Sequence, residues 1–344
     1  MDRRPPFYIG GQAIPAGNYR CVKLQLPLLY STSPIEVPVH IFHGKKEGPI
    51  LFVSGAVHGD EILGVEIIRR LHHQPQLKKI RGTLITLPVV NVYGFLLQSR
   101  YLPDRRDLNR QFPGQHQGSL ASRLAQLLMA EIIEKCTHGI DLHTGAIHRS
   151  NYPQIRVSHS NSVANEMAEA FAAPVIINSP IRAGSLREAA DKRNIPIIVY
   201  EVGEALRFDL WGIKLGVRGI LRTMNFLNMF PPSMSKKFRP ISKIARAESS
   251  FWIRAPQSGM VVTARPLGSY VKKDEILADM ADPMSDETAQ IVCPCDAVII
   301  GKTNIPLVNE GDALFHLGLF EDWHQLTFPP NIHPEWQEDD DAFR

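Results

Sequence analysis

Apolar runs of strand length alternate with stretches of helical spacing between Gly48 and Asn228, and this alternation constrains the fold more than any other feature. The strand-like runs are PILFVSGAV, GTLITLPVV, HGIDLHTG, APVIINS and IPIIVYEVG. The pattern is typical of crossover units, in which helices join parallel strands. One helix start is also marked locally, because Ser185 followed by Glu188 is a capping box. We therefore predict an α/β fold with a mixed, mostly parallel sheet that helices cover on both faces.

The length and the local composition predict more than one domain. A chain of 344 residues exceeds the size that a single core usually supports. We expect an α/β domain over 1–230, followed by a linker over 231–250 that is rich in proline, serine and basic residues. Short β-like segments between turn signals predict a small all-β domain over 251–325. The last residues, 326–344, are polar and acidic, which is typical of a solvated tail.

The composition excludes several classes of protein. Apolar residues make up 44% and charged residues 21%, as in an ordinary globular protein, and the net charge of 38 − 35 = +3 is scattered. This predicts no nucleic-acid partner. The N-terminus lacks a signal-peptide core and no apolar run reaches the roughly 18 residues that span a bilayer, so we expect a cytoplasmic protein without a membrane partner. A homo-oligomer is compatible with the sequence. Cys293 and Cys295 lack the second pair that a zinc site needs.

Potential metal ligands follow two of the apolar runs. His58 and Glu61 come directly after the first run, and His143 lies at the end of HGIDLHTG, 143 − 61 = 82 residues after Glu61. Ligands bind at strand ends in α/β sheets. Two histidines and one carboxylate, with an open fourth position, are the ligand set of a catalytic zinc. We therefore predict one Zn²⁺ per chain; the alternative is a surface histidine and a glutamate that the helix dipole favours.

Four further carboxylates could act together with these residues. Hydrolysis at a metal needs a base that takes a proton from water and passes it to the leaving nitrogen. Glu201 ends the run IPIIVYE and is our candidate, with Glu204 as its competitor. Asp60 and Asp141 flank the predicted ligands, so they either orient them through hydrogen bonds or are solvated.

The loop SRYLPDRRDLNRQFPG is rich in arginine. Guanidinium groups can hold a carboxylate in a bidentate manner or stabilise a developing oxyanion. For Arg105 and Arg106 we expect only a solvated position, because charge runs usually face water. Arg100 and Arg110 remain as candidates for contact with a substrate.

Four motifs, HGDE, DLNRQFPG, DLHTG and YEVGE, in this order, resemble the succinylglutamate desuccinylase/aspartoacylase family, which is similar in fold to the zinc carboxypeptidases. The resemblance covers Pro49 to Gly203 by motif. It implies a zinc-dependent hydrolase that cleaves the amide bond of an N-acyl amino acid or a related small amide. It also implies that His58, Glu61 and His143 bind the zinc.

The same resemblance implies roles for five more residues. Glu201 matches the glutamate that serves as general base and acid, and Asn109 and Arg110 match the pair that grips the substrate carboxylate. Arg100 matches the arginine that polarises the scissile carbonyl, although the loop after it is longer than in aspartoacylase, which leaves a neighbouring arginine as an alternative. Arg187 in SLREAA resembles an arginine that contacts substrate.

The segments APQSGMVVTARPLGSYVKKDEILADM and VCPCDAVIIGKTNIPLVNEGDALFHLG resemble the two halves of a biotinyl/lipoyl-type domain. Such carrier domains bear their cofactor on a lysine in the hairpin between the halves. Here the hairpin reads ADPMSDETAQ and has no lysine. We therefore expect a structural or oligomer contact, or a restriction on which acyl group or amino acid enters the site.

Two other functions compete with deacylation. One is a zinc carboxypeptidase that acts on short peptides. The other is a non-catalytic binding module that keeps the fold. The presence of all three predicted ligands and of Glu201 favours an enzyme over the binding module.

Overall fold

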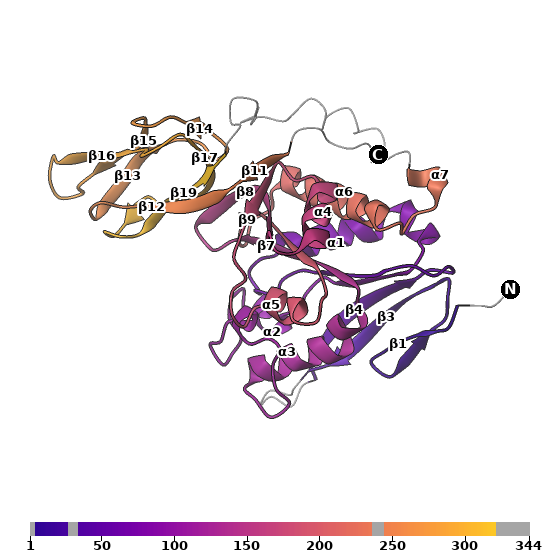
Figure 1. The fold of residues 1–344 in the computed structure, drawn as a ribbon. Helices are drawn as coiled ribbons and strands as arrows, with labels where there is room; N and C mark the ends of the chain where they lie inside the picture. The colour runs from indigo at the N-terminus through magenta and orange to yellow at the C-terminus, as the bar shows by residue number, and fades with distance from the viewer. Residues whose placement is uncertain (1–3, 27–33, 236–243, 321–344) are drawn as a thin grey trace.

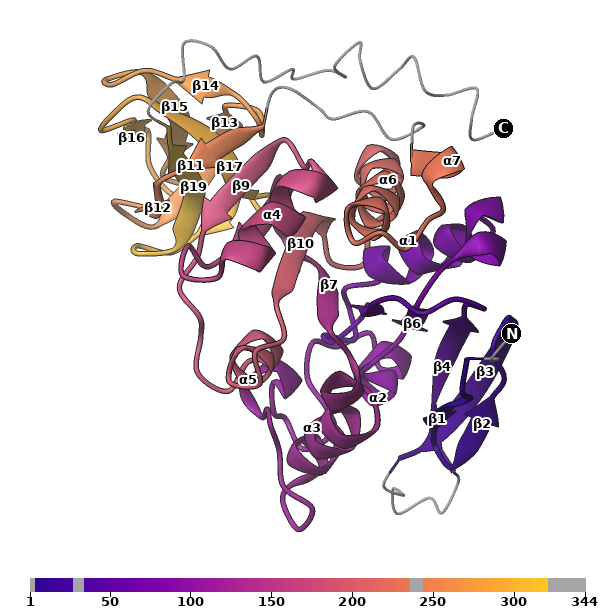
Figure 2. The same ribbon diagram turned by 45° about the vertical axis from the view of Figure 1, so that its right-hand side comes forward.

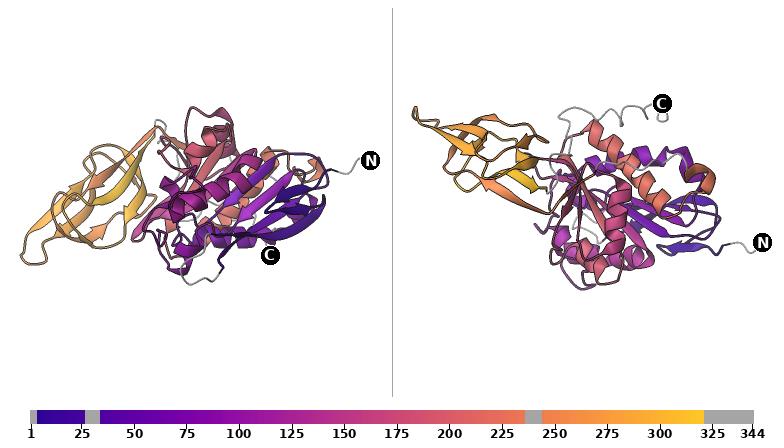
Figure 3. Two further views of the ribbon diagram at one scale, coloured as in Figure 1. Left: turned by 90° about the horizontal axis from the view of Figure 1, so that it is seen from below. Right: turned by 45° about the horizontal axis from the view of Figure 1, so that its top comes forward.

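The computed structural model describes residues 4–26, 34–235 and 244–320. An α/β region forms the larger part, and an all-strand region projects from one end of it (Figures 1 and 3). The predicted tail, 326–344, lies outside the described residues. Within the described residues, no helix has the length and apolar character needed to cross a membrane.

Four parallel strands form the centre of the main sheet, in the order β6–β5–β7–β10. Their residues are almost all buried, as expected for parallel strands covered on both faces. Because the strands are parallel, their carboxyl ends meet at one edge of the sheet, which positions the site described below. The strands are β5 (Ile50–Ser54), β6 (Thr83–Leu87), β7 (His138–Gly145) and β10 (Ile197–Glu204).

Antiparallel strands extend this sheet on both sides. On one side, β4 pairs antiparallel with β6, and β3 pairs antiparallel with β4. On the other side, β8 pairs antiparallel with β10. Strand β9 then pairs parallel with β8, and β11 pairs parallel with β9. A separate hairpin joins β1 to β2. The large mixed sheet of the prediction is therefore confirmed. These strands are β1 (Phe7–Ile9), β2 (Gln12–Ile14), β3 (Asn18–Gln25), β4 (Glu36–His43), β8 (Arg149–Val157), β9 (Val175–Asn178) and β11 (Ala245–Ala247).

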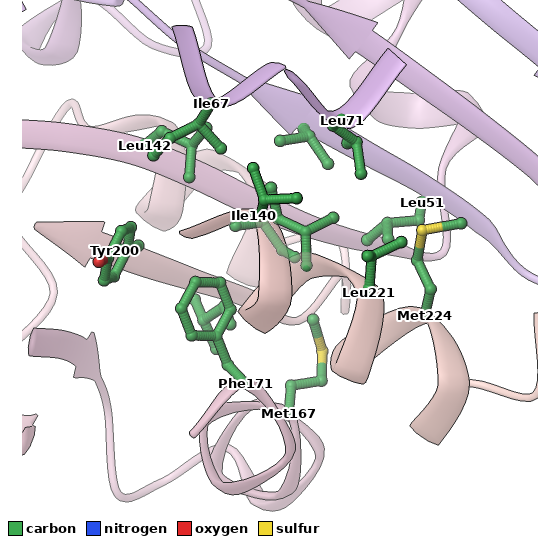
Figure 4. Close-up of a cluster of buried hydrophobic side chains, with 14 of the residues drawn as sticks. Leu51, Ile67, Leu71, Ile140, Leu142, Met167, Phe171, Tyr200, Leu221 and Met224 are labelled. Carbon is green, nitrogen blue, oxygen red and sulfur yellow. The ribbon is translucent and has the colours of Figure 1, made fainter. Parts of the chain in front are cut away.

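Helices lie on the two sides of the sheet (Figures 1 and 2). On one side are α1 (Leu63–His72), α4 (Ser162–Phe171) and α6 (Leu210–Phe226), and on the other α2 (Val92–Leu96), α3 (Leu120–Glu131) and α5 (Leu186–Asp191). Figure 4 shows side chains of α1, α4 and α6 packed onto the strands in a continuous apolar cluster. The remaining helical turns are η1 (Pro75–Lys79), η2 (Leu108–Arg110), η3 (Ile133–Lys135) and α7 (Pro232–Ser235).

The predicted helix start at Ser185 has one of the two bonds of a capping box, and the second reaches the residue before the cap. The Ser185 hydroxyl accepts a hydrogen bond from the Glu188 backbone N–H at 3.1 Å. The Glu188 carboxylate accepts one from the N–H of Gly184 at 2.8 Å. The first bond satisfies a donor that the helix N-terminus leaves free, and the second holds the residue before the cap, so together they fix where α5 begins.

The C-terminal region is built from strands alone. Strands β12, β19, β17 and β14 form one layer and β16, β15, β13 and β18 another, with an apolar cluster of their own between them. Strand β17 also pairs with β8, so the first layer continues the sheet of the α/β region. These strands are β12 (Ser249–Arg254), β13 (Gly259–Ala264), β14 (Tyr270–Val271), β15 (Ile276–Ala281), β16 (Thr288–Val292), β17 (Ala297–Thr303), β18 (Leu307–Val308) and β19 (Ala313–Leu319).

The segment predicted as a linker, 231–250, contains regular structure at both ends. Helix α7 lies at its start, β11 pairs with β9 of the main sheet, and β12 begins at Ser249. The apolar residues Ala245 and Ala247 are buried, which explains why this part joins the sheet although its surroundings are polar. The domain boundaries remain predictions.

Candidate active site

The predicted metal ligands lie where the central strands end. Strand β5 ends at Ser54, four residues before His58, and His143 lies near the end of β7. Glu201 of β10 is the register partner of His143 across the parallel pair. The turn from His58 to Glu61 lies directly against α2: a Cβ added at Gly59 would be 2.0 Å from the carbonyl carbon of Gly94. Parallel pairing and a tight turn thus bring distant parts of the sequence together.

His58, Glu61 and His143 form one compact, buried group. The two oxygens of Glu61 each lie 2.7 Å from an imidazole, one from Nδ1 of His58 and the other from Nδ1 of His143. The three potential ligand atoms lie within 4.8 Å of one another. The backbone N–H of Thr144 donates to Glu61 at 3.1 Å. This arrangement can hold a metal ion, and its donors are those of a catalytic zinc site.

Two further carboxylates orient the imidazoles through contacts with their Nε2 atoms. Nε2 of His143 lies 2.8 Å from Asp141, which also accepts a bond from the Ser54 hydroxyl at 2.7 Å. Nε2 of His58 lies 3.1 Å from Asp107. Carboxylates at these positions are typical of metal-binding histidines. Asp60 does not take this place beside His58: its Oδ1 is buried without a hydrogen-bond partner.

The electrostatics of the group favour a cation. Burial alone lowers the pKa of His58, but Glu61 and Asp107 outweigh it and raise the pKa. Burial also acts to lower the pKa of His143, and Asp141 and Glu61 raise it well above its usual value. Although burial acts to raise the pKa of Glu61, the two imidazoles lower it, so this carboxylate is ionised. The same negative charges would favour a divalent ion.

Arg100 lies beside the histidine and glutamate group. Its Nη2 donates to Asp107 at 2.9 Å, and its Nη1 lies 3.3 Å from His58 and 3.4 Å from Glu61. Burial acts to lower its pKa, but Glu61 and Asp107 raise it, so the guanidinium is charged. Arg105 and Arg106 are exposed and do not line the cavity around the group. Of these three arginines, Arg100 is the one within reach of a ligand there.

Glu201 and Glu204 have different surroundings. One oxygen of Glu201 accepts a hydrogen bond from Asn151 at 2.7 Å, and the other lies 3.0 Å from Nε of Arg156 in an ion pair. Glu201 also lines the cavity, whereas Glu204 does not. The oxygens of Glu204 accept bonds from the His148 N–H and the Asn304 side chain, which connect the α/β region to the β region.

The other predicted substrate contacts also lie at the cavity. Asn109 uses Oδ1 to accept the backbone N–H of Leu186 at 2.9 Å, which ties its loop to α5 and leaves its NH₂ group to donate to a ligand. Arg110 is exposed and its Nη1 donates to the Asn109 carbonyl. Arg187 donates to the carbonyls of Ser179 and Pro180, and its Nη1 has no hydrogen-bond partner.

The cavity has a volume of about 260 Å³ and six arginines line it. Carboxylates in the lining number three: Glu61, Asp141 and Glu201. Burial lowers the pKa of Arg182 and of Arg187, and neighbouring arginines lower both further, which shows that these cations repel one another. The lining of the cavity therefore carries more cationic than anionic side chains. The arginines are Arg100, Arg110, Arg149, Arg156, Arg182 and Arg187.

Trp252, in strand β12 of the β region, lines the cavity. Its ring stacks on His316, with centroids 4.7 Å apart and planes 5° apart, and the Arg149 guanidinium lies 5.5 Å from the ring centre. Burial and Arg156 lower the pKa of His316 to about 3, so its ring is neutral. Four residues of the lining were not predicted from the sequence: Arg149, Arg156, Arg182 and Trp252. No motif marks them, because β8 and β12 reach the site only through the fold.

Comparison with known proteins gives a consistent picture. The succinylglutamate desuccinylase/aspartoacylase catalytic domain family matches residues 47–227. A protein of Halomonas elongata named N-alpha-acetyl-L-2,4-diaminobutyric acid deacetylase is 24% identical over 305 residues, which are 85% of this chain and 89% of that protein.

Solved structures show the same fold. A succinylglutamate desuccinylase/aspartoacylase from Rhodobacter sphaeroides has a TM-score of 0.78 and 22% identity, with 88% of this chain and 96% of the other covered. The ectoine utilization protein EutE from Ruegeria pomeroyi, in a product-bound structure, has a TM-score of 0.78 and 19% identity, with 88% and 95% covered. The shared fold thus extends beyond residues 47–227.

Proposed function

Because this chain belongs to the succinylglutamate desuccinylase/aspartoacylase family, we propose that it is a zinc-dependent hydrolase that cleaves the amide bond of an N-acyl amino acid or a related small amide with a carboxylate. One observation carries this proposal: the buried group of His58, Glu61 and His143 adjoins a small cavity that Glu201 also lines. A metal group and a carboxylate outside it are the parts that metal-assisted amide hydrolysis needs, and the arginines of the cavity suit a substrate that bears a carboxylate.

His58, Glu61 and His143 would hold one zinc ion per chain. When bound, the ion would activate water and polarise the amide carbonyl. The residues fit this ion because two imidazoles and one carboxylate converge, and because Asp107 and Asp141 hold the far side of each ring.

Glu201 takes the proton of the attacking water and passes it to the leaving nitrogen. Asn151 and Arg156 hold its two oxygens from the neighbouring strand, so the carboxylate is fixed toward the cavity before substrate binds. A base held in this way loses little orientational freedom in the reaction. Glu204 is unsuited to the role because both its oxygens bind groups that join the two regions.

The arginines and Asn109 bind the substrate. Arg100, next to the metal group, donates to the carbonyl oxygen as negative charge develops on it. The Asn109 amide, Arg110 and Arg187 hold the substrate carboxylate. Trp252 of the β region narrows the cavity and restricts the group that enters beside it.

The charge of the cavity further defines the substrate. The deacetylase of Halomonas elongata is named for a diaminobutyric acid derivative, which bears a free amine that is cationic at neutral pH. Six arginines would repel such an amine. We infer that this chain prefers a substrate with a second carboxylate, either on the acyl group or on the amino acid.

The proposal is tested with a panel of N-acetyl and N-succinyl amino acids and the zinc-loaded protein, by release of free amine. We expect kcat/KM for a dicarboxylate to exceed that for N-α-acetyl-diaminobutyrate by roughly tenfold or more, the effect of about 1.4 kcal/mol of differential binding. A preference for the cationic substrate would overturn the charge argument.

Two other results would replace the function itself. Faster cleavage of short peptides would indicate the carboxypeptidase, although a cavity of about 260 Å³ favours a small molecule. The protein would be a non-catalytic binding module if it hydrolyses no substrate and holds less than about a tenth of an equivalent of zinc per chain even after zinc is added.

A further inference from the structure

A second and larger cavity lies away from the active site, near the β3–β4 edge of the sheet. Its volume is about 730 Å³, within the range of roughly 300–1,000 Å³ that small-molecule sites occupy. It is lined by the start of β3, the end of β4, the end of α1, η1 and the start of α7. None of the residues that line the active-site cavity also lines this one.

Basic residues surround this cavity without compensating acids. The lining contains Lys45–Lys46, Lys78–Lys79 and Arg81, and no aspartate or glutamate. Among the described residues, none of the four lysines forms an ion pair or a side-chain hydrogen bond, whereas Lys135 and Lys192 each pair with a glutamate one helical turn away. Nε of Arg81 is buried and has no hydrogen-bond partner. Positive charge is therefore concentrated here and unpaired.

One wall of the cavity is formed by packed rings. The ring centroids of Tyr19 and Phe42 lie 4.7 Å apart, and those of Phe42 and His72 lie 5.4 Å apart. Burial, aided by His40 and His73, lowers the pKa of His72 to about 4, so this ring is uncharged at neutral pH. Tyr19 is half exposed, which leaves ring surface free for stacking. The wall can accept a flat group beside the lysines.

We propose that this cavity binds a small organic anion in which a flat ring is joined to phosphate groups, the chemistry of a nucleoside diphosphate. Lysine ammonium groups bind phosphate as point charges, and aromatic side chains stack on bases. The volume favours a small molecule over a nucleic-acid strand, which needs an extended groove. This site is independent of the proposed hydrolysis.

Isothermal titration of the full chain with ADP, pyrophosphate and adenosine tests the proposal. We expect one ADP per chain with a Kd below roughly 1 mM, weaker binding of pyrophosphate and the weakest binding of adenosine. Each exposed ion pair contributes up to about a fivefold change in affinity. K78A/K79A removes two such lysines, so it should weaken ADP binding by roughly 5- to 25-fold. K272A/K273A removes the same charge from the β region and should have no effect. Y19A should weaken ADP and leave pyrophosphate unchanged.

Four results would overturn the proposal. The first is no saturable ADP binding by the folded chain. The second is an equal loss in K78A/K79A and K272A/K273A, which would show only a long-range charge effect. The third is that ADP competes with substrate and its Kd is unchanged in K78A/K79A, which would mean that ADP binds in the arginine-lined cavity. Tighter binding of a single-stranded oligonucleotide than of ADP would also overturn the small-molecule assignment.

Discussion

Two parts of the active-site cavity differ in how many of their charged atoms have hydrogen-bond or ion-pair partners. We call His58, Glu61 and His143 the floor of the cavity and the six lining arginines its wall. On the floor, both nitrogens of each imidazole and both oxygens of Glu61 have partners at 2.7–3.1 Å. On the wall, burial and then neighbouring arginines lower the pKa of Arg182 and of Arg187, and Nη1 of Arg187 is unpartnered. The chain thus fixes the orientation of the floor itself, and we propose that an anionic ligand balances the charge of the wall.

This difference predicts that floor and wall fail in different ways. Substitutions on the floor should change metal content, because the ligands and their supports act on the ion. Substitutions on the wall should change KM at constant metal content, because the arginines act on the substrate. Glu201 lies between the two and should change neither, only turnover.

The largest effect is expected for Glu201. Glu201→Gln keeps the size and hydrogen-bonding reach of the side chain but removes the base, so kcat should fall by roughly 10²–10⁴-fold while zinc is retained. Glu61→Gln should instead lower zinc affinity, because it removes a charged ligand. Metal analysis and kcat for both variants check this.

Glu204→Gln is the matched control, because Glu204 lies on the same strand end but does not line the cavity. It should retain near-normal turnover. The assignment fails if Glu201→Gln loses its zinc or keeps its activity, and a large loss in Glu204→Gln would make Glu204 the base.

The sequence predicted the floor because local patterns specify it. His58 and Glu61 share one short turn, and the apolar runs before His143 and Glu201 predicted strand ends that parallel pairing then aligns. The α/β sheet followed from the same runs. Asp107 could not be predicted as the partner of His58, since its loop reaches the histidine only after folding.

Half of the wall arginines were missed, namely Arg149, Arg156 and Arg182, and two of these come from a strand without a clear sequence signal. Strand β8 supplies Arg149 and Arg156, but Pro153 and the fully buried Gln154 interrupt its apolar pattern. Trp252 lies in the β region, which the pairing of β17 with β8 brings alongside the cavity. Pairing between strands that are far apart in the sequence leaves no local sequence pattern that would predict it.

On the wall, Arg110 should give the largest change in substrate affinity. A hydrogen-bonded contact with a charged group contributes about 1.5–3 kcal/mol, so Arg110→Ala should raise KM for carboxylate substrates by roughly 10- to 150-fold at unchanged zinc content. Arg105→Ala is the control, since Arg105 is an exposed arginine of the same loop that does not line the cavity. Equal KM values in the two variants would show that Arg110 does not hold the carboxylate.

On the floor, Asp141 should affect the metal without touching it. Asp141→Asn keeps the shape but removes the charge behind His143, so zinc affinity should fall by roughly 10- to 100-fold. Asp60→Asn is the control, because Asp60 is as close in sequence to a ligand but makes no bond to either imidazole. Competition with a chelator measures both. Equal losses would mean that general charge near the site matters, and the specific contact does not.

The smallest effect is expected for Trp252, and it tests whether the β region belongs to the wall. Its ring contacts Arg149 and His316, and such aromatic and cation–π contacts contribute about 0.5–1.5 kcal/mol. Trp252→Ala should therefore raise KM by roughly 2- to 10-fold and change the ranking of acyl groups, while zinc content and kcat for the best substrate change little. Trp252→Phe keeps a flat ring and should restore the ranking. If Trp252→Ala alters only the unfolding temperature and leaves KM and the ranking unchanged, the ring is a packing contact between the two regions, and the wall is made by the α/β region alone.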